Sequence, residues 1–393
     1  MPEPKDQNPR AHRLPISTGP VELAGLTWDQ LKTIAAERLG GGHGFARRVH
    51  EDALKGGRFR PEALPGTHRN RTAWANHFAL SLPEVGSVQE EPGDHGVTAK
   101  VVLRWPGGLE TECVFLPMGR GRTTLCISTQ VGCKMGCGFC ETGRMGLLAH
   151  LRADQIISQL LVARHQLGWD FKNVVFMGMG EALDNAEAVI QALRVMTDSA
   201  GLAIAQQRLT VCTVGHVDGI RKLSAANFRR LNLSVSLNAP EDALRDELMP
   251  INRRYDLTEL QAALKAYRPR PNFALGVNYC LLPGINDGRE RARQIARFCE
   301  PLGRVLLNLI PYNPGHAPIT RAPREDEITR FTGFLRDEGL PVRRRVTKGR
   351  HVMAACGQLG NVDLRTRQRA QQMAKHGKRP PSQPEARRDP PAS

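Results

Sequence analysis

Four of the nine cysteines in this 393-residue chain lie close together, between Cys126 and Cys140. The last three, Cys133, Cys137 and Cys140, follow a C-x3-C-x2-C spacing with glycines between them. Glycine permits the tight turns that would bring these thiolates onto one inorganic centre. Because iron–sulfur clusters usually take four thiolates, three would leave one iron open to a ligand that is not protein. The spacing therefore indicates an iron–sulfur site.

Two other interpretations of these cysteines stay open. A structural zinc site wants four protein ligands, commonly in two C-x2–4-C pairs, and no second pair is evident. The cysteines can also lie together by chance, as small buried side chains. Both fit the spacing less well than a cluster does.

The C-x3-C-x2-C spacing resembles the signature of the radical-SAM superfamily. The resemblance implies one 4Fe-4S cluster on Cys133, Cys137 and Cys140, with its open iron chelated by the amino and carboxylate groups of S-adenosylmethionine (SAM). One electron from the cluster would split SAM into methionine and a 5′-deoxyadenosyl radical. In such enzymes the cofactor carries the difficult chemistry, and the protein supplies binding and orientation.

Charge and composition narrow the class of protein. The formal net charge of +16, from 55 Lys and Arg against 39 Asp and Glu, indicates a polyanionic partner such as nucleic acid. A merely soluble basic protein is the alternative. Apolar residues make up 40% of the chain, enough for a large core, but no apolar run approaches a membrane span. The odd, partly clustered cysteines and an N-terminus without an apolar signal region favour a cytoplasmic protein.

We expect four segments. Residues 1–20 are polar and contain prolines, which predicts a disordered tail. Residues 21–95 combine helical spacing with many arginines, which favours a helical accessory domain that docks RNA; a helical cap with a solvated basic face is the alternative. Residues 96–361 hold a leading β-hairpin and then a barrel. Residues 362–393 are predicted to be a disordered basic tail, which either adds RNA affinity or has no specific role.

From about residue 123, strands alternate with helices, which predicts an α/β fold with a parallel sheet and right-handed crossovers. The expected strands are Thr124–Thr129, Asn173–Met177, Arg208–Thr213, Leu231–Leu237, Ala274–Leu281 and Arg304–Ile310. The expected helices are Asp154–Leu167, Asn185–Thr197, Val217–Ala226, Leu257–Tyr267, Gly288–Glu300 and Glu325–Glu338. Short apolar strands covered by helices predict a partial (β/α)6 barrel with its chemistry at the strand carboxyl ends.

Polar groups recur at these predicted strand ends. Gly178 and Gly180 would let a ligand approach the backbone, and the Glu181 carboxylate can accept hydrogen bonds from an ammonium group. Later strand ends offer groups suited to ribose hydroxyls and adenine edges: Cys212, Thr213, Ser236, Asn238 and Asn313. For each one alone a structural loop role is the alternative, and their recurrence favours a binding site.

Two further residues are candidates outside the strand ends. Glu112, at the end of the hairpin, is either a base with a tuned pKa or an ordinary strand residue. Cys356 lies among small residues that would leave its sulfur accessible. The other lone cysteines, Cys113, Cys280 and Cys299, are expected to be small buried side chains.

Longer stretches resemble the RlmN/Cfr family of radical-SAM RNA adenine methyltransferases. They occur in the family's order across about residues 112–361 and include LCISTQVGCKMGCGFCETGRMG, NVVFMGMGEALDN, VSLNAPEDALRDELMPINRRY, LLPGINDG, LNLIPYNP and AACGQLGN. The N-terminal helical unit also resembles the family's accessory domain. The C-x3-C-x2-C motif belongs to the whole superfamily, whereas Cys126 together with AACGQL is specific to this family.

The resemblance implies a two-stage reaction. Cys356 would take a methyl group from one SAM, and a second SAM at the cluster would give the radical that removes hydrogen from the new S-methyl group. The resulting methylene radical would add to an electrophilic adenine carbon and link RNA to protein. Cys126 would form a transient disulfide with Cys356 to release the product, and Glu112 would accept the adenine proton.

By the same resemblance, the residues in contact with SAM would be Gly180, Glu181, Cys212, Ser236, Leu237, Asn238 and Asn313. Three positions depart from the family's pattern. Cys212 stands where Ser is common, Asn238 where His is common, and Ala182 where the carbon-2 enzymes usually have Pro. The sequence GMGEAL occurs in the carbon-8 branch instead.

The sequence thus predicts an enzyme that methylates carbon 2 of an adenine in 23S ribosomal RNA, with transfer RNA as a further target. One alternative is carbon-8 methylation as in Cfr, which protects ribosomes from antibiotics. Others are another RNA target, a non-catalytic iron–sulfur RNA-binding protein, or an unrelated radical-SAM enzyme, which would not need Cys356. The expected partners are RNA and an electron donor such as flavodoxin or ferredoxin. We expect a monomer that binds no membrane.

Overall fold

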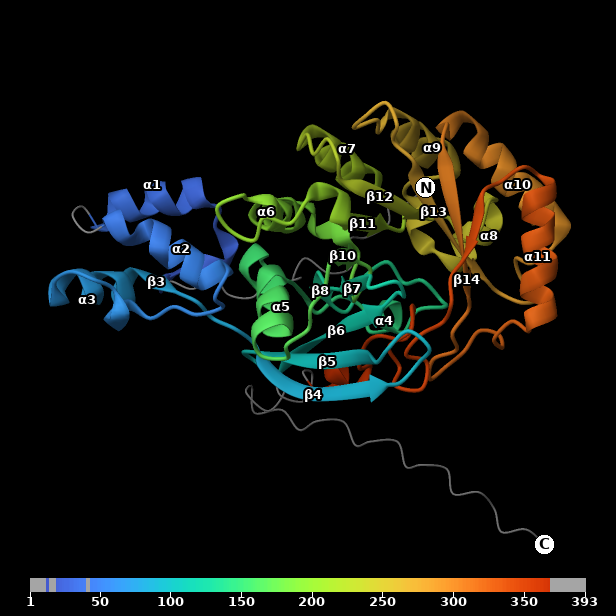
Figure 1. The fold of residues 1–393 in the computed structure, drawn as a ribbon. Coiled ribbons are helices and arrows are strands. Elements are labelled where there is room, and N and C mark those ends of the chain that lie inside the picture. The colour runs from blue at the N-terminus through green and yellow to red at the C-terminus, as the bar shows by residue number, and fades with distance from the viewer. Residues whose placement is uncertain (1–11, 14–18, 40–42, 368–393) are drawn as a thin grey trace, which may run out of the picture.

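The computed structural model describes residues 12–13, 19–39 and 43–367. Within them, the strands of the main sheet follow the order β15-β14-β13-β12-β11-β10-β7-β6-β5-β4. From β7 to β15 neighbouring strands run parallel, whereas β4, β5 and β6 run antiparallel. Helices α5 to α11 lie around the parallel part (Figure 1). The expected α/β fold with a partial barrel is confirmed.

The parallel part alternates strands and helices along the chain. The strands are β7 (Thr123–Cys126), β10 (Asn173–Phe176), β11 (Leu209–Thr213), β12 (Asn232–Ser236), β13 (Leu275–Leu281), β14 (Val305–Pro311) and β15 (Val342–Arg344). The helices are α4 (Glu141–Arg144), α5 (Ala153–His165), α6 (Ala186–Thr197), α7 (Val217–Ala225), α8 (Asp242–Leu248), α9 (Leu257–Ala266), α10 (Arg289–Cys299) and α11 (Glu325–Asp337). Buried apolar residues from neighbouring strands form the core, among them Leu125, Val174, Val211, Leu233, Val277 and Leu307. This core fixes the positions of the strand carboxyl ends relative to one another.

Two strands extend the sheet beyond those expected. β4 (Glu84–Glu91) pairs with β5 (Thr98–Trp105), which pairs with β6 (Leu109–Pro117). β4 lies in the segment that the sequence assigned to the helical unit, and its mostly exposed, glutamate-rich residues hide the strand pattern. β15 at the opposite edge contains only Val342, Arg343 and Arg344. Short or charged strands of this kind are typical of sheet edges.

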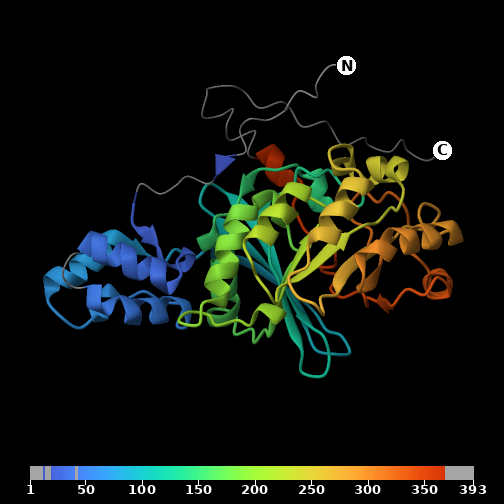
Figure 2. The ribbon, with the colours of Figure 1, turned by 90° about the horizontal axis from the view of Figure 1, so that it is seen from above.

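The N-terminal helices α1 (Trp28–Leu39), α2 (Ala46–Leu54) and α3 (His68–His77) form a unit with its own core. Figure 2 shows this unit beside the barrel. Hydrogen bonds fix it there: the Trp28 N–H donates to Asp198 Oδ2 (2.5 Å), and Gln191 Nε2 donates to the Gly25 carbonyl (2.8 Å).

The chain ends are described only in part. β1 (His12–Arg13) pairs with β9 (Ala149–His150), which pairs with β8 (Gln130–Val131). Residues 363–367 are helical, and Leu364 is buried beside Met145. Most other residues of the tails expected at 1–20 and 362–393 lie outside the described residues. In the described part, no helix is both long and apolar enough to cross a bilayer.

Candidate active site

The cysteine loop follows β7 at the carboxyl edge of the sheet, where barrels of this kind place their chemistry. Cys133 and Cys137 are buried, and Cys140 is half-buried just before α4. Apolar side chains surround them, namely Met135, Leu248, Met249, Leu282 and Tyr312. The Gly138 N–H donates to the Leu248 carbonyl (3.1 Å) and so ties the loop to the end of α8.

The three thiols of the loop have the donor chemistry of a cationic metal centre. Burial raises the pKa of each thiol; in addition, Cys137 raises the pKa of Cys133, and Cys140 raises that of Cys137. A cationic metal centre would stabilise the thiolates and offset this effect. Among the described residues, no three His, Cys, Asp or Glu side chains converge as they would on one ion.

A cavity opens beside this loop, at the carboxyl ends of the parallel strands; we call it the cofactor cavity. Its lining joins two of the loop cysteines to most of the expected strand-end residues: Cys137, Cys140, Gly180, Glu181, Cys212, Ser236, Asn238 and Cys356. Two expected residues lie elsewhere. The Leu237 side chain is buried in the core, and Asn313 lines a neighbouring cavity.

Glu181 is fixed at one wall of the cofactor cavity. Its Oε1 accepts from the Leu183 N–H (3.0 Å), and its Oε2 accepts from the Val214 N–H (2.8 Å). Burial raises the pKa of Glu181 to about 7. The preceding Gly180 has a φ of +99°, a conformation that favours glycine. An ammonium group bound here would compensate the buried carboxylate, which favours a ligand with such a group.

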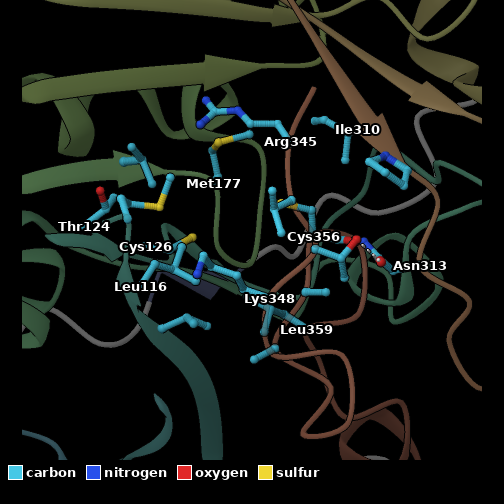
Figure 3. Close-up of a pocket in the computed structure, with 18 residues that line it drawn as sticks. Leu116, Thr124, Cys126, Met177, Ile310, Asn313, Arg345, Lys348, Cys356 and Leu359 are labelled. Atoms are coloured by element: carbon cyan, nitrogen blue, oxygen red, sulfur yellow. Dashed lines mark hydrogen bonds between the residues drawn. The ribbon is translucent and has the colours of Figure 1, made fainter. Parts of the chain in front are cut away.

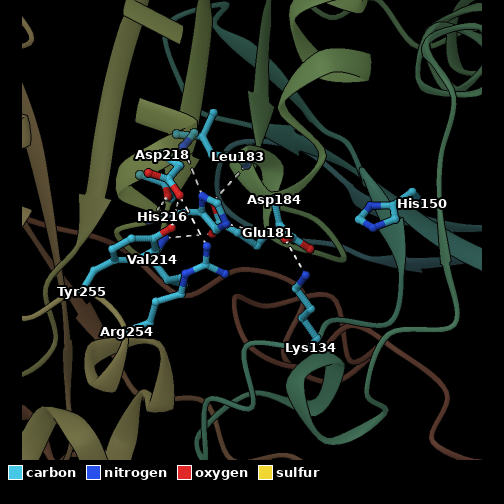
Figure 4. A network of polar contacts seen from close by, with 12 residues as sticks. Lys134, His150, Glu181, Leu183, Asp184, Val214, His216, Asp218, Arg254 and Tyr255 are labelled. Atoms are coloured by element: carbon cyan, nitrogen blue, oxygen red, sulfur yellow. Dashed lines mark hydrogen bonds and ion pairs between the residues drawn. The ribbon is translucent and has the colours of Figure 1, made fainter. Parts of the chain in front are cut away.

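A polar network behind Glu181 joins the cysteine loop to the turn that follows Glu181 (Figure 4). Lys134 of the cysteine loop pairs with Asp184 (2.8 Å), which also accepts from Gln130 Nε2 (2.8 Å). His216 Nε2 lies 3.6 Å from Asp184, and its Nδ1 accepts from a backbone N–H (3.1 Å). The ring proton therefore lies on Nε2 and faces the carboxylate. These contacts hold the cysteine loop in place relative to Glu181.

Two asparagines shape the opposite wall. Asn238 has a left-handed backbone with a φ of +55°, which asparagine tolerates better than most residues. Its Oδ1 accepts from the Cys280 N–H (2.9 Å), so this side chain holds β13 in place. Asn278 on β13 is buried at the cavity, and its Nδ2 has no hydrogen-bond partner within the described part of the chain. A buried, unpaired donor favours a ligand that accepts a hydrogen bond there.

Arg245 of α8 connects the strand ends and is only 1% exposed. Its guanidinium donates to the carbonyls of Val214 (2.6 Å) and Leu237 (3.2 Å) and to Asn252 Oδ1 (3.2 Å). Burial lowers the pKa of Arg245 to about 10, and the Cys137 thiol opposes this shift. A buried cation beside the cysteine loop would balance the negative charge of its thiolates.

Cys126 and Cys356 reach a second cavity from opposite sides (Figure 3). Cys126 is buried at the end of β7, and Cys356 is exposed. Burial raises the pKa of Cys126, and the nearby Cys356 raises it further. Desolvation of its thiol by the cavity walls raises the pKa of Cys356, while the Arg345 guanidinium lowers it. Because Cys356 lines both cavities, it stands at their junction.

The segment that carries Cys356 is held by residues from several loops. Thr142 Oγ1 donates to the Leu359 carbonyl (2.5 Å). Asn313 Nδ2 donates to the Cys356 carbonyl (3.3 Å), and its Oδ1 accepts from Thr347 Oγ1 (3.2 Å). In this structure, Asn313 thus supports the Cys356 backbone rather than the cofactor cavity.

Glu112 on β6 faces the same segment and is 8% exposed. Its Oε1 accepts from Lys100 Nζ (3.3 Å), and its Oε2 accepts from the Gly360 N–H (3.0 Å). Burial raises the pKa of Glu112, and Lys100 opposes the shift. Ser128 Oγ donates to the Glu112 carbonyl (2.6 Å), which fixes the backbone as well. A buried carboxylate with a raised pKa is suited to accept a proton.

Comparisons with known proteins bear on the whole chain. The Radical SAM superfamily model matches residues 127–299. The probable dual-specificity RNA methyltransferase RlmN 1 of Protochlamydia amoebophila is 38% identical over 348 residues, which cover 88% of this chain and 96% of the relative. The dual-specificity RNA methyltransferase RlmN of Alkalilimnicola ehrlichii is 42% identical over 304 residues, covering 76% and 82%. The chain belongs to the RlmN/Cfr family of radical-SAM RNA methyltransferases.

A solved structure of a related enzyme has the same fold. The radical SAM methyltransferase from Sphaerobacter thermophilus superposes with a TM-score of 0.78 at 34% identity, covering 86% of this chain and 99% of that one. As a member of the RlmN/Cfr family, the present protein is a radical-SAM enzyme that methylates RNA. The family implies an iron–sulfur cluster and SAM as cofactors.

Several residues of this RlmN/Cfr-family site were not proposed as site residues from the sequence, among them Lys100, Arg245, Asn278 and Arg345. Cys113 and Cys299 are buried as expected, but the same expectation was wrong for Cys280, which is half-buried and lines the cofactor cavity. Lys100 has the pattern of an ordinary residue in a hairpin, and Arg245 lies within a family motif without any local sign of burial. Only contacts with distant segments reveal their positions.

Proposed function

We propose that this RlmN/Cfr-family enzyme methylates carbon 2 of an adenine in 23S ribosomal RNA and in transfer RNA. The names of its relatives, dual-specificity RNA methyltransferases, support this proposal. The structural support is the position of Cys356, which is exposed and lines both the cofactor cavity and the cavity of Cys126. A sulfur at this junction is able to receive a methyl group on one side and present it on the other.

When bound, the cluster and SAM would supply the methyl group and the radical chemistry that an unreactive adenine carbon requires. Cys356 would attack the methyl group as a thiolate, favoured by Arg345. Loss of a hydrogen atom from the S-methyl group would then let its carbon bond to the adenine, so that RNA and protein become linked. Cys126 would attack the Cys356 sulfur, so that a disulfide forms, the sulfur–carbon bond breaks, and the released carbon takes up a proton to become the methyl group of the RNA. Glu112 would accept the adenine proton.

The residues of the cofactor cavity would divide the binding of these groups. Cys133, Cys137 and Cys140 would hold the cluster. Glu181 and the backbone at Gly180 would accept hydrogen bonds from the SAM amino group. Polar groups on the facing strands would bind the ribose and adenine of SAM; they are Cys212, Ser236 and Asn238, with the unpaired amide of Asn278.

The partners follow from charge and from the chemistry. The N-terminal helical unit would dock RNA, and the net charge of +16 over the whole chain supports a polyanionic partner. An electron donor such as flavodoxin or ferredoxin would reduce the cluster of the monomeric enzyme. Because both the RNA substrates and a reduced cluster belong in a reducing compartment, we place the reaction in the cytoplasm.

The test is incubation of the reduced, cluster-loaded protein with SAM and with separated 23S ribosomal and transfer RNA, followed by nucleoside mass spectrometry. We expect 2-methyladenosine in both RNAs. The variant Cys356→Ala should still bind the cluster and SAM but give no methylated RNA. Formation of 8-methyladenosine would support the carbon-8 reaction, which Ala182 favours. Methylation by Cys356→Ala would overturn the mechanism, and the absence of any methylation by the parent protein would overturn the function.

A further inference from the structure

Lys100 on β5 occupies an unusual position for a lysine, because it is only 5% exposed. Its ammonium group donates to Glu112 Oε1 and to the carbonyl of Met353, both at 3.3 Å. Lysines are almost never buried unless they are paired. Here one carboxylate and one carbonyl account for the burial.

The two residues together hold both ends of the segment that carries Cys356. Lys100 binds the carbonyl of Met353, which precedes Cys356, and Glu112 binds the N–H of Gly360, which follows it. On the antiparallel pair β5–β6, Glu112 lies opposite Val102, so Lys100 is its diagonal neighbour on the same face. The register of the hairpin therefore fixes the ammonium group and the carboxylate side by side.

We propose that Lys100 is a positioning residue that keeps Glu112 ionised and places it, together with the Cys356 segment, for removal of the adenine proton. This inference rests on the proposed function and adds to it a residue that lines neither of the two cavities. Glu110 on the same strand carries a charge that disfavours ionisation of Glu112. Lys100 is thus the cation that keeps this buried carboxyl group able to accept a proton.

The sign of the pH effect follows from this arrangement. Burial raises the pKa of Glu112, and Lys100 lowers it. Without the ammonium group the carboxyl would hold its proton to higher pH and would be a poor base near neutrality. Removal of Lys100 should therefore shift the acidic limb of the pH–rate profile to higher pH. A residue that only supports the fold would not move this limb.

The experiment compares Lys100→Met, Lys100→Arg and the exposed control Lys265→Met in cluster-loaded enzyme with RNA. Three quantities are measured: methylation of Cys356 by intact mass, the covalent RNA–protein species on denaturing gels, and the rate of its resolution against pH. In Lys100→Met we expect the first two to persist and resolution at neutral pH to slow about 100-fold, with the acidic limb at higher pH. Lys100→Arg keeps the charge and should keep the limb near its original position.

The outcomes separate the two proposals. If the parent enzyme forms neither methylated Cys356 nor an RNA adduct, the proposed function fails, and the role of Lys100 fails with it. If the parent methylates RNA and Lys100→Met resolves the adduct with an unchanged limb, only the role of Lys100 fails. Should Lys100→Met not fold, Lys100→Arg decides alone. If the acidic limb of Lys100→Arg moves further in pH than that of Lys265→Met, the proposal is overturned. If it does not move, the proposal is supported.

Discussion

The backbone N–H of Glu141 donates to the carbonyl of Gly357 at a distance of 2.8 Å. This bond joins the residue after Cys140 to the residue after Cys356. With the bond from Thr142 to Leu359, it makes one hydrogen-bonded unit of the cysteine loop and the Cys356 segment. The protein itself therefore sets the distance between the cluster loop and the thiol that would accept the methyl group.

Replacement of Thr142 by Val tests this coupling. The side chain keeps its shape but loses the bond to the buried Leu359 carbonyl, which costs about 1–3 kcal/mol, and its contact with the Cys140 thiol. We expect SAM cleavage to persist while methylated RNA falls about tenfold, because the thiol is no longer well placed. The matched control is Thr332→Val, which removes a similar bond to Ile328 within α11. A parallel fall of SAM cleavage and methylation would show that the bond serves stability alone.

Replacement of Cys126 by Ala should trap the RNA adduct. Without the second thiol, the disulfide that releases RNA from Cys356 cannot form. We expect a covalent protein–RNA species on denaturing gels and loss of turnover. Cys299→Ala, which changes a buried cysteine on α10, should release its product normally. Multiple turnovers by Cys126→Ala would contradict the resolving role.

Replacement of Arg345 by Gln should make the Cys356 thiol less reactive. The guanidinium lowers the pKa of Cys356 against the effect of the surrounding walls, so its loss raises this pKa. At pH 8 we expect alkylation of Cys356 by iodoacetamide to slow several-fold, because a higher pKa lowers the fraction of thiolate at this pH. Peptide mass spectrometry follows the rate at this cysteine, and Arg345→Lys should restore most of it. Equal rates in the parent and Gln variants would refute an electrostatic role.

Replacement of Glu181 by Gln should remove a pH dependence of SAM binding. With a pKa of about 7 in the free protein, the carboxyl is mostly protonated at pH 6 and mostly ionised at pH 8. An amino-group ligand prefers the ionised form, so SAM should bind about tenfold more weakly at pH 6. Since the amino group of SAM titrates identically with both proteins, their difference isolates Glu181. If SAM binding by Glu181→Gln depends on pH as it does in the parent protein, the contact between Glu181 and the SAM amino group is excluded.

The same residue affects the stability of the free protein. Its pKa rises from 4.5 to about 7 on folding, so ionisation opposes folding. This cost is absent below about pH 4.5, grows through pH 7 and is complete above it, where it reaches about 3 kcal/mol. Thermal unfolding at pH 5 and pH 8 checks the sign: Glu181→Gln should gain stability relative to the parent only at pH 8.

The sequence predicted the parallel strands and their helices to within one or two residues for most elements, because apolar periodicity carries that information. It missed β4 and β15, whose polar or very short sequences form strands only through their neighbours. The positions of Lys100 and Arg245 were also missed. Their partners Met353 and Val214 are distant in sequence, so no local pattern indicates that these cations are buried.

Cys356 belongs to the walls of two cavities at once, and this has a consequence for timing. Its backbone is fixed by Asn313, and the segment around it is fixed by Glu112 and Lys100. A methyl group on Cys356 would then pass from the cofactor cavity to the cavity of Cys126 by rotation about the side-chain torsion of one cysteine. Such rotations take picoseconds to nanoseconds, whereas movements of whole loops take far longer. Only the Cys356 side chain would rotate while its backbone stays fixed, so transfer between the cavities would not limit the rate of turnover.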